Sequence, residues 1–292
     1  MNWLEGLEKI VRRDEPLAMH TWFQLGGPAE FFAEPRCVEE LAALVQRCRE
    51  QEVPLRILGR GSNILVRDEG VRGVVVQLTA GVFRQIQVQA EQIVAGGGAR
   101  LGRVVTAAVH EGLAGLEPLV AIPGSVAGAL CTNAGAVGTD IGQWVVSAKV
   151  MTETGQMVDR SREELGLGYR QCNLDDPVIL EVRFHLEPDD PHHLAQRLQK
   201  LWILKKAKQP MGHQSAGYIF KDPPGLSAGE LIEQAGLKGT RIGGAVVCDR
   251  NANFIIAEPE CTAQDVLRLI DLLRQQVRDR LGVELELGLE IW

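Results

Sequence analysis

Residues 58–66 read LGRGSNILV and overlap the end of PLRILG at 54–59, which has the composition of a buried strand. Glycine lets the backbone adopt positive φ angles and approach a ligand closely. Consecutive backbone N–H groups in such a turn form a concave site for an anion, and Ser62 and Asn63 add side-chain donors. The pattern G-x-G-S-N differs from the G-x-G-x-x-G of a Rossmann unit. The stretch therefore predicts a phosphate-binding turn in an α/β protein of another kind.

Two further glycine-rich segments occur in the same half of the chain. They read LGGPAEFF at 25–32 and IPGSVAGALCTNAGA at 122–136. Each segment by itself is equally typical of a tight turn in any α/β protein. The three segments together favour a ligand that contains a pyrophosphate, because each can bring backbone N–H groups close to an anion.

The composition is that of a globular protein without a nucleic-acid footprint. Of the 292 residues, 45% are hydrophobic and 24% are charged, and the formal net charge is −7, so no basic surface for nucleic acid is expected. The six cysteines are scattered without a C-x-x-C pair, which predicts reduced thiols and no metal site. The charged start and the lack of a long apolar run predict neither a signal peptide nor a membrane span.

Hydrophobic periodicity predicts a chain in which helices and strands alternate. Helices are expected at 38–51, at 101–108, at 192–207 and from Thr262 onward. Strands are expected at 54–59, 74–78, 84–89, 92–96, 178–186 and 283–291, and a hairpin at 149–159. The apolar stripe of the third helix consists of Leu194, Leu198, Leu201 and Leu204.

Local signals mark helix starts and one domain boundary. The residue pairs spaced as N-terminal caps are Ser227 with Glu230 and Thr262 with Asp265. The segment EPDDPHH at 187–193 breaks the strand pattern with charges and two prolines, which predicts a boundary there.

Six motifs spread over nearly the whole chain resemble the UDP-N-acetylenolpyruvoylglucosamine reductase family, also called UDP-N-acetylmuramate dehydrogenase. They are HTWFQLGGPA at 20–29, LGRGSNILV at 58–66, GLAGLEPLVAIPGSVAGALCTNAGA at 112–136, GYR at 168–170, SAGYIFKDPPG at 215–225 and NANF at 251–254. The resemblance is to the shorter type of the family. It implies an α+β fold: a vanillyl-alcohol-oxidase-like (PCMH-type) FAD-binding lobe of two α+β subdomains, followed by a smaller C-terminal α+β substrate-binding domain. The implied domains are an N-terminal segment at 1–19, the FAD-binding domain at 20–188 and the substrate-binding domain at 189–292.

The resemblance also implies the cofactor, the co-substrate and the reaction. NADPH reduces FAD, and the flavin reduces UDP-N-acetylglucosamine enolpyruvate to UDP-N-acetylmuramate for peptidoglycan synthesis. The implied partner is a UDP-sugar, and no nucleic acid or membrane is expected as a partner. The protein is expected to be a monomer or a weak oligomer. The positions matched to cofactor binding are Gly59, Arg60, Gly61, Ser62, Asn63, Ile64, Ile122, Pro123, Gly124, Ser125, Gly128, Asn133, Ala134 and Gly135.

The chemistry of this reaction needs a cation at the substrate carboxylate and a proton donor near the enolate-like intermediate. Arg170 matches the position of the family's active-site arginine. The serine that the family uses falls on Tyr218, and its glutamate falls on Gly288. The Tyr218 phenol can donate a proton or can plug the pocket. At Gly288 the carboxyl group is lost.

Further departures concern neighbouring charges. Glu286 and Glu290 share a strand face with Gly288, so they either replace the lost carboxylate through a bulge or are solvated. Lys221, Asp222 and Asn251 match substrate-binding positions, although the family has an asparagine where Asp222 stands and a histidine where Asn251 stands. An aspartate there weakens anion binding unless it is protonated or paired.

These departures leave three hypotheses open. The first is a reductase of the family. The second is a divergent flavoprotein that binds FAD but has lost the reductase activity. The third is a FAD oxidoreductase with an unrelated substrate.

Overall fold

The computed structural model describes residues 3–136, 138–210 and 214–292. The chain folds into two compact units. Unit 1 comprises Met1–Glu15, Glu30–Arg60 and Arg72–Ile203, and unit 2 comprises Pro16–Ala29, Gly61–Val71 and Leu204–Trp292. No described helix combines the length and the apolar character that a membrane span requires.

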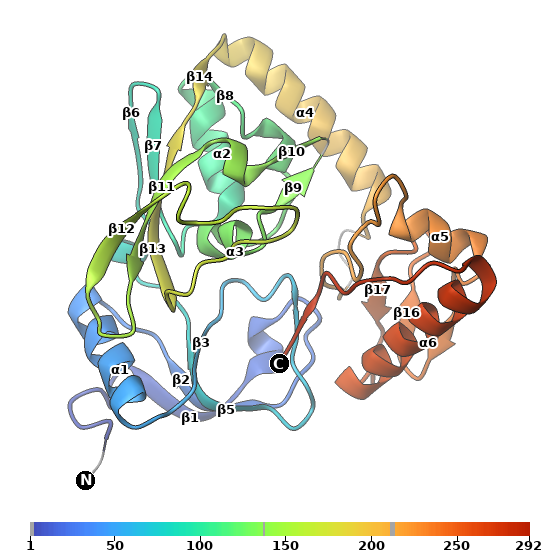
Figure 1. The fold of residues 1–292 in the computed structure, drawn as a ribbon, viewed down its shortest axis with the longest axis horizontal. Coiled ribbons are helices and arrows are strands. Elements are labelled where there is room, and N and C mark those ends of the chain that lie inside the picture. The colour runs from blue at the N-terminus through green and yellow to red at the C-terminus, as the bar shows by residue number, and fades with distance from the viewer. Residues whose placement is uncertain (1–2, 137, 211–213) are drawn as a thin grey trace. The chain divides into compact units, whose positions relative to one another are not determined.

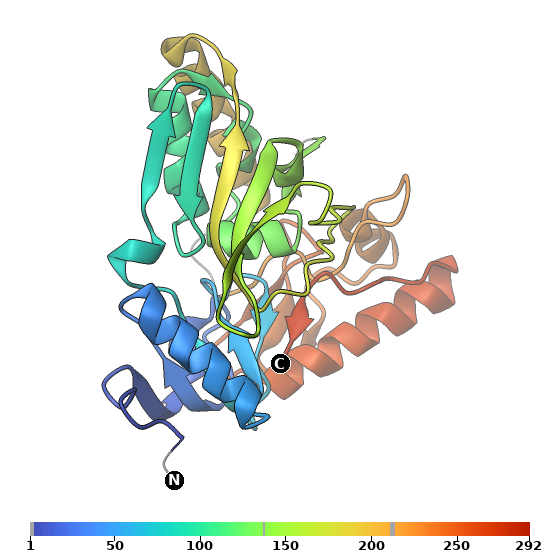
Figure 2. The same cartoon turned by 60° about the vertical axis from the view of Figure 1, so that its left-hand side comes forward.

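The first half of unit 1 is a four-stranded sheet packed against helix α1 (Figure 2). Its strand order is β1 (Val11–Pro16), β2 (Pro28–Ala33), β5 (Val71–Val76) and β3 (Leu55–Ile57). Helix α1 (Val38–Glu50) buries Leu41, Leu44, Val45 and Cys48, which follow the predicted 3.6-residue period. These side chains share one core with residues of β2 and β5.

The second half of unit 1 is an antiparallel five-stranded sheet with α2 (Leu101–His110) and α3 (Val126–Cys131) on one face (Figure 1). Its strand order is β12 (Met157–Ser161), β11 (Val145–Met151), β13 (Val178–His185), β7 (Gln92–Gly96) and β6 (Ile86–Gln89). Strand β13 joins the two halves, because Val178 and Leu180 belong to the α1 core and Val182 and Phe184 to the core under α2.

Short elements complete unit 1. They are the strands β8 (Leu113–Ala114), β9 (Gly135–Ala136), β10 (Thr139–Asp140) and β14 (Glu187–Pro188), and the 3-10 turns η2 (Gly81–Phe83), η3 (Glu117–Leu119) and η4 (Ile141–Gln143). Helix α4 (Pro191–Lys208) leads from unit 1 into unit 2. Its expected stripe is only partly right: Leu194 is fully buried, but Leu204 is 60% exposed, because the apolar core beneath the start of the helix does not extend to this turn.

Unit 2 packs α5 (Ala228–Gln234) and α6 (Ala263–Leu281) on a three-stranded sheet of β15 (Arg241–Ile242), β16 (Ala245–Val247) and β17 (Ile255–Ala257). It also holds η1 (Leu17–His20), β4 (Ile64–Leu65) and β18 (Glu290–Ile291), of which the two strands pair in parallel. Both predicted N-caps are confirmed: the Ser227 and Thr262 side chains accept from the backbone N–H groups of Glu230 and Asp265.

The predicted final strand at 283–291 is wrong over most of its length. Only Glu290 and Ile291 are in a strand, and Leu287 forms an isolated bridge with Phe220. The alternation that suggested a strand is nevertheless real burial, since Leu285 and Leu289 are at most 5% exposed. Apart from Leu287 and the last two strand residues, the segment pairs with no strand among the described residues, so the ladder of a sheet does not form.

Candidate functional site

A cavity of about 290 Å3 lies in unit 1 between the two sheet-containing halves. The first half contributes 57–60 and 77–79 to its lining, and the second contributes Gly97, Gly98 and Ser125 among others. The cavity therefore lies where the segments that follow β3 and β7 meet the start of α3. Of the predicted cofactor residues, those that line the cavity are Gly59, Arg60, Ser125 and Gly128.

Glycines form the cavity wall because the backbone approaches too closely for a side chain. A Cβ at Gly97 would lie 2.1 Å from the Ile179 carbonyl oxygen, and one at Gly98 would lie 2.2 Å from that of Leu78. A Cβ at Gly59 would lie 2.6 Å from Ser125 Oγ. Gly97 and Gly98 were missed by the sequence prediction, although the run GGG at 96–98 was a usable signal. A cofactor can therefore come against main chain here.

Ser125 holds the start of α3 in place. Its side chain is 3% exposed, and its Oγ accepts from the backbone N–H of Gly128 at 3.2 Å. The backbone N–H groups of Val126 and Ala127 donate to the carbonyl oxygens of Ala99 and Gly97. Two amides at the start of α3 are thus satisfied by the neighbouring glycine-rich loop. Other predicted residues of this segment, which do not line the cavity, are Ile122, Pro123, Gly124, Ala134 and Gly135.

The second half of the predicted phosphate turn belongs to unit 2. Gly61 has φ +60°, and a Cβ there would lie 2.3 Å from the His20 carbonyl oxygen, so the position requires glycine. The Ser62 carbonyl accepts from Gly217 N, and Asn63 Nδ2 donates to the Gly288 carbonyl at 2.7 Å. Ile64 opens β4. This part of the turn thus makes contacts within unit 2.

Arg170 lies in a tight turn with an unusual backbone conformation. Gly168 and Gln171 exchange backbone hydrogen bonds, and Arg170 has φ +53°, which is uncommon for a residue with a Cβ. Asn133, predicted to bind the cofactor, donates from Nδ2 to the Gly168 carbonyl at 2.8 Å and accepts at Oδ1 from Gly142 N at 3.0 Å. Asn133 is 5% exposed. Its amide therefore fixes the turn that carries Arg170.

Tyr218 and Gly288, which the sequence predicts at the serine and glutamate positions, lie close together in unit 2. Gly288 N donates to the Ile219 carbonyl at 2.9 Å, and a Cβ at Gly288 would lie 3.4 Å from the Tyr218 carbonyl oxygen. The Tyr218 side chain is 40% exposed, and its ring centroid lies 5.0 Å from that of Phe254. The sequence prediction placed these two residues in one site, and the structure brings their backbones together.

Asn253 holds the Tyr218 segment, and the sequence prediction gave it no role. Its side chain is 2% exposed; Oδ1 accepts from Phe220 N and Nδ2 donates to the Phe220 carbonyl, both at 2.9 Å. Its own carbonyl accepts from Ile219 N. The one available signal was its place in NANF, next to the predicted Asn251.

Each predicted substrate residue has a local partner. Lys221 Nζ lies 2.5 Å from Glu286 Oε1, and the Asp222 carboxylate accepts from Ala228 N at the start of α5. A helix N-terminus favours a negative charge, so Asp222 is compensated there. Asn251 Oδ1 accepts from Asn253 N at 3.0 Å.

The other glutamate considered as a replacement is also engaged. Glu290 Oε1 accepts from Trp292 Nε1 at 2.8 Å. The Glu286 side chain, bound by Lys221, is 73% exposed. The structure thus supports the interpretation of both as surface carboxylates.

Three arginine side chains give the cavity a positively charged lining. Arg60, Arg84 and Arg100 all line it. Burial lowers the pKa of the Arg60 guanidinium, and the positive charges of Arg100 and Arg84 lower it further. Among the described residues, no group of three or more His, Cys, Asp or Glu side chains gathers as a metal site would require.

Comparisons with known proteins cover both units. The family model for a FAD binding domain matches residues 29–161, and that for the C-terminal domain of UDP-N-acetylenolpyruvoylglucosamine reductase matches residues 209–292. The reductase from Rhodopirellula baltica is 39% identical over 99% of this chain and 94% of its own length. UDP-N-acetylenolpyruvoylglucosamine reductase 2 from Symbiobacterium thermophilum is 43% identical over 97% of this chain and 92% of its own.

A solved structure agrees with these relatives. The crystal structure of UDP-N-acetylenolpyruvylglucosamine reductase from Thermus caldophilus has a TM-score of 0.82 and 34% identity, covering 97% of this chain and 98% of that one. The predicted α+β class is confirmed, with a FAD-binding domain and a smaller C-terminal domain of this reductase family. The chain belongs to the UDP-N-acetylenolpyruvoylglucosamine reductase family.

Proposed function

We propose that the protein uses FAD to reduce UDP-N-acetylglucosamine enolpyruvate to UDP-N-acetylmuramate, with NADPH as the source of hydride. The observation that carries the proposal is the glycine-walled cavity, which lies largely within the match to the FAD binding domain. A Cβ at Gly97, Gly98 or Gly59 would clash there. The protein resembles reductases of this name along nearly its full length.

Each residue of the proposed site would have a distinct chemical role. When bound, FAD accepts hydride from NADPH and supplies it to the enolpyruvyl double bond. Arg170 neutralises the substrate carboxylate, where negative charge develops. The carbon that does not receive hydride needs a proton, and the Tyr218 hydroxyl is the donor we assign to it. Lys221, Asp222 and Asn251 bind the nucleotide sugar.

We assign FAD binding to residues 20–188 and substrate binding to residues 189–292, after an N-terminal segment at 1–19. The protein would work in the cytoplasm as a monomer or weak oligomer. Size-exclusion chromatography with light scattering checks the last point. A stable dimer or a larger assembly at micromolar concentration contradicts it.

Two measurements test the reductase proposal. The purified protein should show a flavin absorption spectrum, or acquire one with added FAD. NADPH oxidation should then depend on the enolpyruvyl nucleotide. A folded protein that takes up FAD but never oxidises NADPH with this substrate contradicts the reductase activity and leaves FAD binding intact.

A second candidate is a flavoprotein of this family without reductase activity. It is favoured by the missing carboxylate at Gly288, because Glu286 and Glu290 bind Lys221 and Trp292 instead. The combined substitution Tyr218→Ser and Gly288→Glu tests it. A Cβ at 288 would lie 3.3 Å from the Phe220 carbonyl carbon, so the neighbouring backbone must move by a few tenths of an ångström. Activity in the double variant alone supports this candidate, and normal turnover of the natural protein rules it out.

A further inference from the structure

We propose that Arg84 and Arg100 join Arg60 in an anion subsite of the cavity, which binds the diphosphate of FAD. The inference rests on the proposed binding of FAD. It adds two residues that neither the glycine-rich motifs nor their spacing indicates. With this subsite, the affinity for FAD depends on the charge of the arginines as well as on the shape of the glycine-lined wall.

Three separate segments supply the arginines. Arg60 follows β3, Arg84 follows the η2 turn, and Arg100 is the residue before α2. All three line the same cavity as Gly59, Gly97 and Gly98. They are therefore brought together by the meeting of the two halves of unit 1, and no local sequence pattern joins them.

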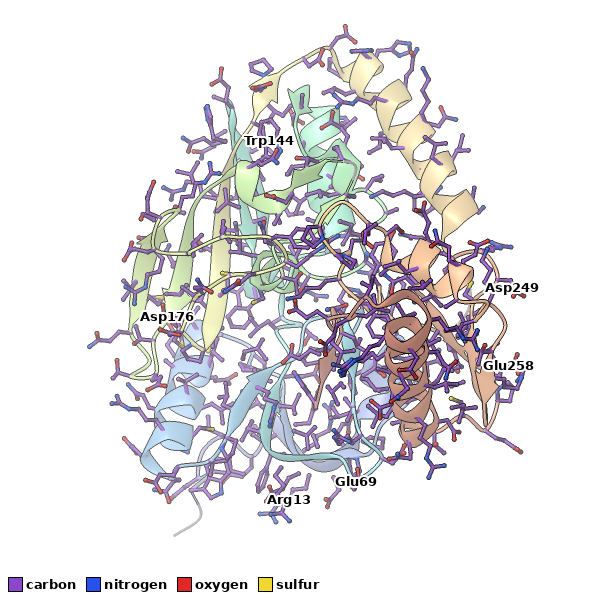
Figure 3. All side chains as sticks on the ribbon, turned by 45° about the vertical axis from the view of Figure 1, so that its right-hand side comes forward. Arg13, Glu69, Trp144, Asp176, Asp249 and Glu258 are labelled. Atoms are coloured by element: carbon purple, nitrogen blue, oxygen red, sulfur yellow. The ribbon has the colours of Figure 1, made fainter. Side chains whose placement is uncertain are left out.

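Among the described residues, no carboxylate forms an ion pair within 4.0 Å with any of the three guanidinium groups. Of the described residues that line the cavity, the acidic one is Asp176, at the end of the five-stranded sheet nearest α1 (Figure 3). Its carboxylate is bound by Arg160 at 2.8 and 3.2 Å, so it is already neutralised.

The arginines are also close enough to repel one another. The positive charges of Arg100 and Arg84 both lower the pKa of the Arg60 guanidinium, after the larger effect of burial. Like charges that gather without counter-ions in a protein of net charge −7 are unfavourable by themselves. An anion in the cavity relieves this repulsion.

The chemistry of the groups identifies the anion. Guanidinium groups bind phosphate oxygens with two parallel N–H donors, and three of them match the several oxygens of a diphosphate better than one carboxylate. FAD carries a diphosphate, FMN a single phosphate and riboflavin none. The subsite therefore predicts that affinity falls in the order FAD, FMN, riboflavin. The differences in affinity between these flavins should become smaller when the arginines are removed.

The experiment measures flavin affinity of the apoprotein by fluorescence quenching. The variants are Arg84→Gln, Arg100→Gln and the double variant. Arg103→Gln is the matched control, because Arg103 is an exposed arginine in the first turn of α2, just after Arg100, and does not line the cavity. Each cavity substitution should weaken FAD binding about tenfold, as the loss of a charge-assisted hydrogen bond does, and riboflavin binding should not change.

Salt dependence and a competitor give independent readouts. Binding of FAD by the natural protein should weaken as salt rises, and the double variant should show a shallower dependence. Inorganic pyrophosphate should compete with FAD for the natural protein and lose most of this effect in the double variant. Arg100→Lys keeps the charge and should lie between the natural protein and Arg100→Gln.

The outcomes separate the two proposals. If the natural protein takes up FAD, and the arginine variants bind it with unchanged affinity and salt dependence, the subsite is wrong and FAD binding stands. If riboflavin binding falls as much as FAD binding, the arginines shape the cavity and do not bind the diphosphate. If the folded natural protein takes up no FAD, the proposed function fails and this inference with it.

Discussion

At the scale of single residues, Gly59 leaves space in the cavity wall that any side chain would fill. A Cβ at this position would lie 2.6 Å from Ser125 Oγ, which is also the cap of α3. We expect Gly59→Ala to displace Ser125 and to weaken FAD binding at least tenfold, as measured by fluorescence titration. Gly81→Ala is the control, because nothing lies within 4 Å of a Cβ there.

A double-mutant cycle shows whether the clash with Ser125 is the cause. Ser125→Ala removes Oγ and leaves the next atom of residue 125 at 3.7 Å from the new Cβ. The combination Gly59→Ala with Ser125→Ala should bind FAD better than Gly59→Ala alone. If the loss of FAD affinity in the double variant equals the sum of the losses in the two single variants, this explanation is wrong.

The buried amide of Asn133 acts on Arg170 through the backbone. Asn133→Ala leaves the Gly168 carbonyl and the Gly142 N–H without this partner, so the free energy of unfolding should fall by about 1–3 kcal/mol. If Arg170 binds the substrate carboxylate, kcat/KM should fall as well, while FAD affinity changes less.

Asn133→Asp is the matched variant for this effect, because it keeps the acceptor for Gly142 and replaces the donor to Gly168. It should lose kcat/KM and at least as much stability as Asn133→Ala, because a buried carboxylate oxygen would face the Gly168 carbonyl oxygen. Equal FAD affinity and equal kcat/KM in all three proteins would show that the turn keeps its place without this amide.

At the scale of elements, α6 depends on carboxylates at its first turn. Asp68 accepts from the N–H groups of Ala263 and Gln264, and Thr262 with Asp265 forms a capping box. The backbone N–H of Thr262 lowers the pKa of Asp265, with a smaller contribution from its side chain. A charge at a helix N-terminus also interacts favourably with the helix dipole.

The lowered pKa of Asp265 predicts how stability depends on pH. Because the folded-state pKa lies below the unfolded value of about 4, the ionised carboxylate stabilises the fold above that pH. This contribution is lost as pH falls through the folded-state pKa. The free energies of urea unfolding of the natural protein and of Asp265→Asn should differ most near pH 7 and converge as the pH falls through the folded-state pKa of Asp265. A constant difference across this range contradicts the assignment.

Helix α4 is held to unit 1 by a buried carboxylate. Glu117 is fully buried, one oxygen accepts from Gly115 N, and the other lies 3.3 Å from Arg197 Nη1. Arg197→Ala would leave that carboxylate without its cation, and removal of one partner of a buried pair is costly. Since Arg197 is 53% exposed, we expect a loss of about 1–3 kcal/mol in thermal or urea unfolding.

Glu117→Gln tests the same ion pair from the other side. It removes the buried charge, so Arg197→Ala should cost much less in this background than in the natural protein. An equal cost of Arg197→Ala in both backgrounds would show that the charge of Glu117 is not involved.

At the scale of the whole molecule, the cofactor should stabilise the fold by mass action. A ligand that binds only the native state adds about 2.7 kcal/mol at a concentration one hundred times its Kd. We expect FAD to raise the midpoint of thermal unfolding, and to raise it less in the Arg84→Gln and Arg100→Gln double variant at the same concentration. A midpoint that FAD leaves unchanged in the natural protein contradicts native-state binding.

Much of the architecture was predictable because its signals are local. Helix α1, strand β13 and the caps at Ser227 and Thr262 follow from residues within a few positions of one another. The strand expected at 283–291 failed because pairing depends on a neighbour that the segment itself does not specify. The family assignment was predictable because several motifs occur in one chain.

The sequence by itself determined the fold class, the family and the main helices and strands. Only the tertiary structure decided that Asn133 supports the turn of Arg170, that Asn253 holds the Tyr218 segment, and that Arg84 and Arg100 share a cavity with Arg60. The physical reason is distance along the chain. The Asn133 and Asn253 hydrogen bonds join residues 35 and 33 positions apart, and no periodic pattern encodes which distant backbone groups a side chain will meet.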